Sequence, residues 1–156
     1  MKSLTVLLLL MVVNCSSGIV MALENTVHRV SIDLQPARSG TYYLSGKLTP
    51  LMDINLLLDT GSSFTIFDHS TLQELLALGV AEYKDMIIGV MADGSERQAK
   101  VYVINQLMVG DCRISNLEVV AFTSKATFVL GINALKQLSP FSIDINEKAL
   151  TAHCIT

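Results

Sequence analysis

One aspartate of this chain lies in a sequence context suited to acid–base chemistry. Three leucines at positions 56–58 lead into Asp59, and the segment after it is Thr60-Gly61-Ser62-Ser63. An apolar strand would carry the carboxylate to its end, where the N–H groups and hydroxyls of a turn could fix its orientation. Gly61 would let the backbone of a bound chain approach closely. The ordinary alternative is a strand-to-turn junction, where Asp and Gly are common for conformational reasons alone.

The other residues that could carry chemistry lack a suitable arrangement. His28, His69 and His153 are far apart and show no metal-ligand spacing. Asp68, His69 and Ser70 are the residue types of a catalytic triad, but consecutive residues do not converge as one. Ser70 is instead predicted to cap a helix. Because Gly-rich phosphate loops and Cys-x-x-Cys pairs are also absent from the sequence, we predict neither a metal nor a cofactor.

Length and composition indicate one globular domain. The chain has 156 residues, of which 51% are hydrophobic and 16% are charged, which excludes a disordered polymer. The formal net charge is −3 and no basic run occurs. Nucleic-acid surfaces need clustered Lys and Arg to neutralise phosphates, so nucleic acid is not an expected partner.

The first 22 residues have the layout of a secretory signal peptide. Lys2 precedes an apolar run at positions 4–13, and Val20-Met21-Ala22 resembles a small-residue cleavage site. We therefore expect a signal peptide at residues 1–22, a mature domain at residues 23–156, and a periplasmic or secreted protein. Two alternatives stay open: an uncleaved anchor that holds the domain at the membrane, facing the periplasm, and a lipoprotein modified at Cys15. Only these two would place the protein at a membrane.

The pattern along the rest of the chain predicts a mainly β domain with one or two short helices. Asp93-Gly94, within Ala92-Asp93-Gly94-Ser95, is a strong signal for the tip of a hairpin. Helices are expected at residues 70–78 and 132–138. Strands are expected at residues 27–34, 41–49, 54–58, 64–67, 86–91, 99–109, 113–122, 141–145 and 149–154.

Four segments in this order resemble the retropepsin-like aspartic proteases, and most of all their exported bacterial branch. The first is the apolar strand with Asp59-Thr60-Gly61-Ser62-Ser63, and the second is the hairpin tip at residues 92–95, where the family has its flap. The third is Val129-Leu130-Gly131 before a helix, and the last is a closing pair of strands. The resemblance covers the chain from about Gly40 to Cys154, and it implies a closed β-barrel of the kind that forms half of an acid protease.

The resemblance implies an aspartic endopeptidase that acts as a homodimer. Asp59 is the one aspartate in an Asp-Thr-Gly context, so the second carboxylate of the dyad would be Asp59 of a second copy. The pair would share a proton and activate a water molecule against a peptide bond. Thr60 would bond across the interface, and Gly61 would complete the catalytic loop.

A peptide or protein is the implied substrate. Ser62 and Ser63 would contact it from the loop, and Ala92, Asp93 and Gly94 would close over it as the flap. The competing interpretation is a catalytically silent module of the same fold, which binds peptides or serves as a scaffold in the cell envelope.

Two further features bear on the branch and on the compartment. Retroviral members carry a paired acidic residue and Arg at the positions of Ser63 and Ile132, and this chain lacks both, which favours the bacterial branch. Cys112 and Cys154 form a candidate disulfide, since disulfides persist in exported proteins. The sequence leaves open whether the two thiols pair or remain free.

Overall fold

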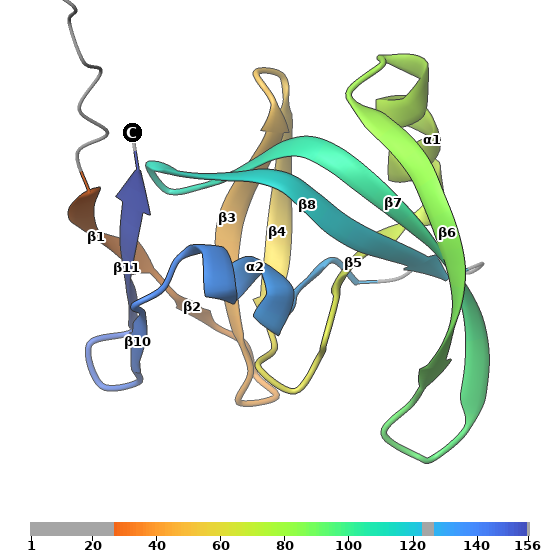
Figure 1. Ribbon diagram of the computed structural model, residues 1–156. Helices are drawn as coiled ribbons and strands as arrows, with labels where there is room; N and C mark the ends of the chain where they lie inside the picture. Colours follow the sequence, from red (N-terminus) through yellow and green to blue (C-terminus); the bar gives the residue numbers. More distant parts are fainter. Residues whose placement is uncertain (1–26, 123–126, 156) are drawn as a thin grey trace, which may run out of the picture.

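The computed structural model describes residues 27–122 and 127–155, and the predicted signal peptide lies outside this part of the chain. Within it, no helix is long and apolar enough to cross a bilayer. The predicted mainly β character and the two short helices are confirmed (Figure 1). The elements are β1 (Val27–Asp33), β2 (Gln35–Pro36), β3 (Tyr42–Thr49), β4 (Met52–Leu58), β5 (Thr65–Asp68), α1 (His69–Ala77), β6 (Ala81–Val90), β7 (Glu96–Val109), β8 (Cys112–Phe122), β9 (Val129–Leu130), α2 (Ile132–Gln137), β10 (Ser142–Asp144) and β11 (Ala149–Ile155).

The larger sheet closes into the predicted barrel. Its strand order is β2-β3-β4-β9-β5-β8-β7-β6, and a further pairing joins β3 to β7 at Gly46↔Val109 and Lys47↔Met108. This pairing closes the ring β3-β4-β9-β5-β8-β7 and leaves β6 as an edge strand beside β7. Closure removes edges from the barrel, but β6 keeps one side of its backbone unpaired within the described sheet.

The barrel interior is filled by alternate residues of its strands and by one side of α1. Along β3 the burial alternates, because successive side chains of a strand point to opposite faces. Leu72 and Leu75 of α1 and Leu135 of α2 pack into the same core. The largest fully buried side chains are Phe67, Leu44, Leu56, Leu72, Leu75, Ile104, Leu107, Ile114, Leu117, Leu130, Leu135 and Leu138.

The short strand β9 lies between β4 and β5. It pairs in parallel with β4 through Leu57↔Val129 and Leu58↔Leu130. On its other side it pairs antiparallel with β5 through Ile66↔Val129. The connection from β4 to β5 must therefore pass around the end of β9, and this connection is the segment that contains Asp59.

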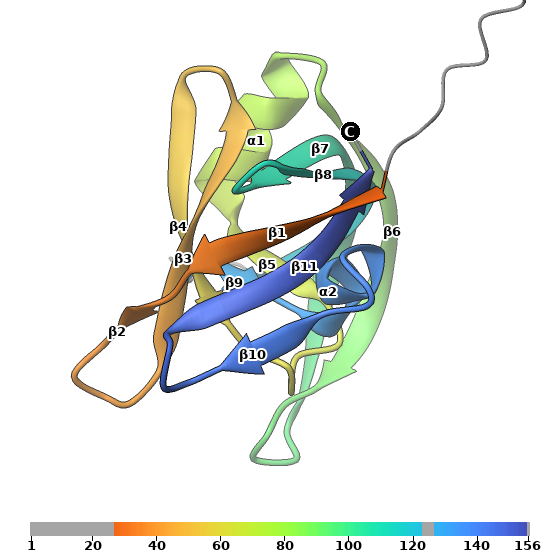
Figure 2. The same ribbon diagram turned by 90° about the vertical axis from the view of Figure 1, so that its left-hand side faces the viewer.

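A second sheet gathers the two ends of the described chain, with strand order β1-β11-β10. β1 and β11 pair antiparallel along their whole length, from Val27↔Ile155 to Asp33↔Ala149 (Figure 2). A disulfide joins the buried residues Cys112 and Cys154, whose Cα atoms are 5.1 Å apart. It fastens β8 of the barrel to β11, so the candidate pairing of the two cysteines is confirmed.

The predicted start of β6 is wrong, because the strand begins earlier in the structure. The strand begins at Ala81 rather than at residue 86. Its first half is rich in charged residues and its register shifts between Tyr83 and Asp85, which breaks the apolar alternation. Tyr83 nevertheless packs against Tyr102 of β7, with ring centroids 5.7 Å apart.

Asp68, rather than the predicted Ser70, caps α1. The Asp68 carboxylate accepts hydrogen bonds from the Thr71 N–H at 2.7 Å and from the Ser70 hydroxyl at 2.7 Å. Burial raises the pKa of Asp68, but these hydrogen bonds outweigh it and hold the pKa below its ordinary value of 3.8. Ser70 lies inside the first turn, where it supports the cap.

The Asp68→Ala variant should lose about 1 kcal/mol of unfolding free energy at pH 7, because the cap loses its acceptor. The pKa of Asp68 is lowered on folding, so its contribution is complete above pH 3.8 and disappears as the pH falls through the folded-state pKa. Urea unfolding at pH 7 and in increasingly acidic buffer measures this difference. Asp68→Asn, which keeps an acceptor oxygen, is the control. A deficit in Asp68→Ala that persists unchanged at low pH would contradict the assignment.

Candidate active site

Asp59 follows β4 directly and is held there by β9. The Leu57 N–H donates to the Phe128 carbonyl at 2.8 Å, and the Asp59 N–H donates to the Leu130 carbonyl at 3.2 Å. These bonds continue the β4–β9 pairing up to the aspartate itself. The barrel therefore fixes the backbone of Asp59, and the loop begins directly after it.

The turn after Asp59 orients its carboxylate. Oδ1 of Asp59 accepts a hydrogen bond from the Gly61 N–H at 2.9 Å, and the Asp59 carbonyl accepts one from the Ser62 N–H at 3.3 Å. The Asp59 side chain is half-buried, whereas Thr60 and Gly61 are exposed. The loop thus presents a fixed carboxylate with a hydroxyl residue and a glycine beside it at the surface.

Ser62 and Ser63 differ in their surroundings. The Ser62 carbonyl accepts from the Ile132 N–H at 2.8 Å, and the Ser62 hydroxyl donates to the Phe64 carbonyl at 2.7 Å. Ser62 therefore ties the loop to the start of α2, a role that its residue type alone did not indicate. Ser63 is exposed on the same loop.

A buried polar network holds β5 and α2 beneath this loop. Thr65 is fully buried, and both its N–H and its hydroxyl donate to Oδ1 of Asn133, at 2.8 and 3.0 Å. The Thr65 hydroxyl oxygen also accepts from the Gly131 N–H at 3.3 Å. Nδ2 of Asn133 donates to the Glu118 carbonyl at 2.6 Å. Buried polar groups are costly without partners, so these bonds specify one arrangement of the three segments.

Sequence reasoning missed Thr65 and Asn133. The available signals were a polar residue inside the apolar run at positions 64–67 and an amide directly after Val129-Leu130-Gly131-Ile132. Gly131, in contrast, was singled out, and the structure gives its physical reason. A Cβ at Gly131 would lie 2.3 Å from the Phe64 carbonyl oxygen and 2.8 Å from the Thr65 nitrogen. Only glycine lets α2 approach the loop this closely.

The predicted hairpin tip forms between β6 and β7. The Met91 N–H donates to the Ser95 carbonyl at 2.8 Å, and Gly94 takes a positive φ of 80°. Ala92, Asp93 and Gly94 are exposed. Hydrogen bonds from the hydroxyl and N–H of Ser95 lower the pKa of Asp93. Both views show this hairpin and the loop between β4 and β5 at the same end of the molecule (Figures 1 and 2).

A small apolar cluster, separate from the main core, lies between the hairpin strands and the loop. Ala99, Val101 and Val120 are buried in it. Phe64 and Ile66, which follow the Asp59 turn, and Ile87 of β6 pack against it while remaining half-buried. The cluster connects the hairpin to the loop on the side of the sheet that carries both.

A family model described as "Aspartyl protease" matches residues 42–134, which is more than half of the chain. The chain belongs to this aspartyl protease family. The match spans the Asp59 loop, the hairpin and the first turn of α2. No match is found among curated proteins.

A solved structure supports the same fold. The chain is similar to the crystal structure of a retropepsin-like aspartic protease from Rickettsia conorii, with a TM-score of 0.58 and 20% sequence identity. The similarity covers 83% of this chain and 92% of that one. At this identity the likeness establishes the fold, so the predicted retropepsin-like architecture is confirmed.

Other parts of the molecule are separate from the Asp59 loop. Among the described residues, no group of three or more His, Cys, Asp or Glu could hold a metal ion. A groove of about 850 Å³ lies between the β3–β4 turn, the end of α1 and β7, where Leu51, Leu78 and Asn105 are among its lining residues. None of the predicted site residues lines it, so it has no part in the arrangement around Asp59.

The Gly131→Ala variant should be destabilised by about 1–3 kcal/mol or more, because a methyl group there meets rigid backbone. Gly89→Ala is a matched control, since its nearest neighbour would be the Arg97 carbonyl oxygen at 3.8 Å, an ordinary contact. Thermal unfolding of both variants measures the difference. Equal stability of the two would show that α2 can move away from the loop at little cost.

Proposed function

We propose that the protein is an aspartic endopeptidase whose dyad consists of Asp59 from each of two identical subunits. The observation that carries the proposal is the presentation of Asp59. A rigid barrel strand, a backbone hydrogen bond from Gly61 and an exposed Thr60 place one oriented carboxylate at the surface. Membership of the aspartyl protease family supports this use of the carboxylate.

The proposed mechanism needs two adjacent carboxyl groups that share one proton, because like charges at short distance cannot both ionise. The ionised group takes a proton from a water molecule, whose oxygen attacks the carbonyl carbon of the peptide. The protonated group donates to the carbonyl oxygen at the same time. Collapse of the tetrahedral diol breaks the C–N bond as the leaving nitrogen gains a proton, which yields an acid and an amine.

A second copy of the chain must supply the other carboxylate. None of the other described aspartates belongs to the 59–64 loop. Asp68 caps α1, Asp93 is at the hairpin tip and Asp111 is in the turn between β7 and β8, and the others lie in strands: Asp33 in β1, Asp53 in β4, Asp85 in β6 and Asp144 in β10. A twofold axis beside the exposed Thr60 would bring two Asp59 side chains together, as C2 dimers do with equivalent residues. This would also explain why Asp59 is only half-buried in one protomer, since each protomer would hold half of a cleft.

The proposed substrate is an extended peptide that lies across the loop under the hairpin. Exposed Gly61 and Ser63 offer backbone groups to it, and Ala92, Asp93 and Gly94 would close over it as a lid. The half-buried Phe64, Ile66 and Ile87 would contact it from the sheet.

We also propose that the protein works outside the cytoplasm, in the periplasm or after secretion. The Cys112–Cys154 disulfide supports this location, because such bonds persist in oxidising compartments. The apolar sequence before residue 22 supports export.

The Asp59→Asn variant should lose peptidase activity by several orders of magnitude while its unfolding midpoint changes little. Both carboxyl groups of the dyad become amides, which can neither take a proton from water nor donate a carboxyl proton to the substrate. Asp53→Asn, in the strand that leads to Asp59, is the matched control and should retain activity. The assay is cleavage of a mixed peptide library, followed by mass spectrometry at several pH values, with and without a statine-type inhibitor. If wild type and Asp59→Asn behave alike and the inhibitor has no effect, the protein is a silent module instead.

Mixing the two proteins tests whether the dyad is shared. A ninefold excess of Asp59→Asn should reduce the activity of a fixed amount of wild type to about one tenth, since random pairing places most wild-type chains in mixed dimers. The substrate is kept in excess, subunit exchange is verified by sedimentation of labelled protein, and serum albumin at equal concentration is the control. Undiminished activity despite verified exchange would contradict a dyad made by two chains.

A further inference from the structure

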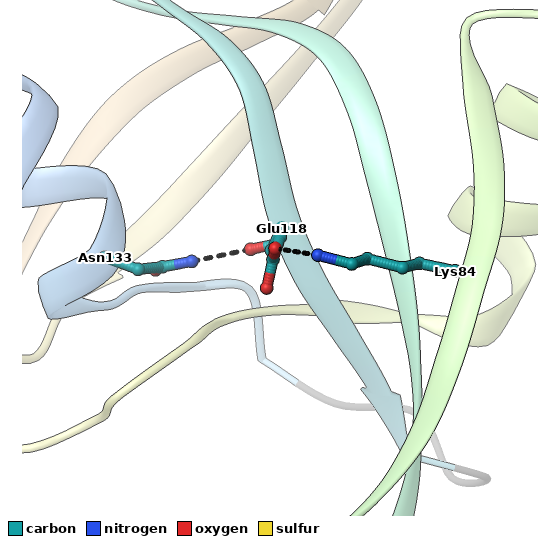
Figure 3. Close-up of polar contacts among 3 residues, drawn as sticks. All are labelled: Lys84, Glu118 and Asn133. Carbon is teal, nitrogen blue, oxygen red and sulfur yellow. Dashed lines mark hydrogen bonds and ion pairs between the residues drawn. The ribbon is translucent and has the colours of Figure 1, made fainter.

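An ion pair connects the two strands that flank β7. Nζ of Lys84 in β6 contacts the carboxylate of Glu118 in β8 (Figure 3). Because the sheet order is β8-β7-β6, this pair spans the whole width of β7. Glu118 lies opposite Val103 of β7, two residues before Val120 and on the same face of β8, so the pair borders the small apolar cluster.

Lys84 is located where the packing of β6 changes. The register between β6 and β7 shifts between Tyr83 and Asp85, which leaves Lys84 as the extra residue of a bulge. Before the bulge, Tyr83 packs on the buried Tyr102. Beyond it, the apolar side chains on one face of β6 are exposed by half or more: Met86 50%, Ile88 64% and Val90 72%. The hairpin from residue 85 onward is therefore held by β7 with little packing on that face.

Glu118 in turn is connected to the framework of the Asp59 loop. Its carbonyl accepts the hydrogen bond from Asn133, whose Oδ1 binds Thr65. Figure 3 shows Glu118 between Asn133 on one side and Lys84 on the other. A chain of polar contacts thus runs from the base of the hairpin to Gly131 and Thr65, which hold the loop in place.

We infer that Lys84 and Glu118 are a positioning pair that sets the base of the hairpin relative to Asp59. The inference rests on the proposed function, because it concerns how the hairpin closes over a peptide. A bulged residue of an edge strand has few other restraints, and a lysine that reaches across β7 limits how far the hairpin can swing away. Loss of the pair should weaken peptide capture and leave the chemical step, which depends on Asp59, unchanged.

The size of the effect follows from the exposure of the pair. The side chains of Lys84 and Glu118 are 50% and 40% exposed, so the contact contributes at most about 1 kcal/mol, or about a fivefold change in an equilibrium. Lys47 and Asp53, at 3.4 Å and with exposures of 48% and 78%, form a similar ion pair on the β3–β4 hairpin. A surface ion pair without a positioning role should behave like this second pair.

The test compares Lys84→Met and Glu118→Gln with Lys84→Arg and with Lys47→Met as the matched control. Glu118→Gln keeps the main-chain carbonyl that Asn133 binds, so it removes the charge alone. Hydrogen exchange of amides at residues 85–95 should become about two- to fivefold faster in Lys84→Met and Glu118→Gln. It should stay at the wild-type rate in Lys84→Arg and Lys47→Met. For peptide cleavage, KM should rise about two- to fivefold with kcat unchanged in the first two variants.

The two readouts separate this inference from the proposed function. If the wild type cleaves no peptide, the endopeptidase proposal fails, and hydrogen exchange still decides whether the pair restrains the hairpin. Exchange at residues 85–95 that is equal in wild type, Lys84→Met and Glu118→Gln overturns the inference. An equal increase in Lys47→Met also overturns it, because the effect would then not be specific to the Lys84–Glu118 pair. A fall in kcat with KM unchanged would place the pair in the chemical step and contradict a positioning role.

Discussion

The position of β9 between β4 and β5 is the constraint on which the region around Asp59 depends. Two strands that follow each other in sequence usually pair directly, but here the later strand β9 occupies the place between them. The chain must then cross the end of β9 to reach β5, and Asp59 is the first residue of this crossing. Its backbone N–H still bonds to the Leu130 carbonyl of β9, so the topology fixes the residue and leaves it partly exposed.

This arrangement is stable because the polar side chains buried at the crossing have hydrogen-bond partners, and because a glycine stands where a larger residue would collide. Thr65 and Asn133 satisfy each other under the loop, and a single unsatisfied group there would cost about 1–3 kcal/mol. Gly131 lacks the side chain that would collide with Phe64. The same residues that stabilise the barrel therefore also hold the carboxylate in a fixed direction, which is the preorganisation that the proposed catalysis would need.

Much of this fold was accessible from the sequence, because its signals are local. The apolar run into Asp59, the Asp93-Gly94 turn and the glycine after Leu130 each predict a feature that the structure contains. The early start of β6 was missed because its apolar alternation is interrupted by the charged residues of a bulge. Asn133 was missed because its partners are Thr65 and Glu118, residues far from it in the chain. Ser70 was predicted as the helix cap in place of Asp68 because both residue types suit that position and they are only two residues apart.

The pairing of Val27 with Ile155 also brings the beginning of β1 beside the end of β11. A short linker between these two strand ends would therefore close the chain into a ring without disturbing the barrel. New ends could be opened at the exposed Leu51, in the tight turn between β3 and β4 and away from Asp59. The Cys112–Cys154 disulfide lies next to the point where this linker would join the two strands. Its architecture is thus compatible with circular permutation, in which the order of the segments changes while the crossing over β9 stays intact.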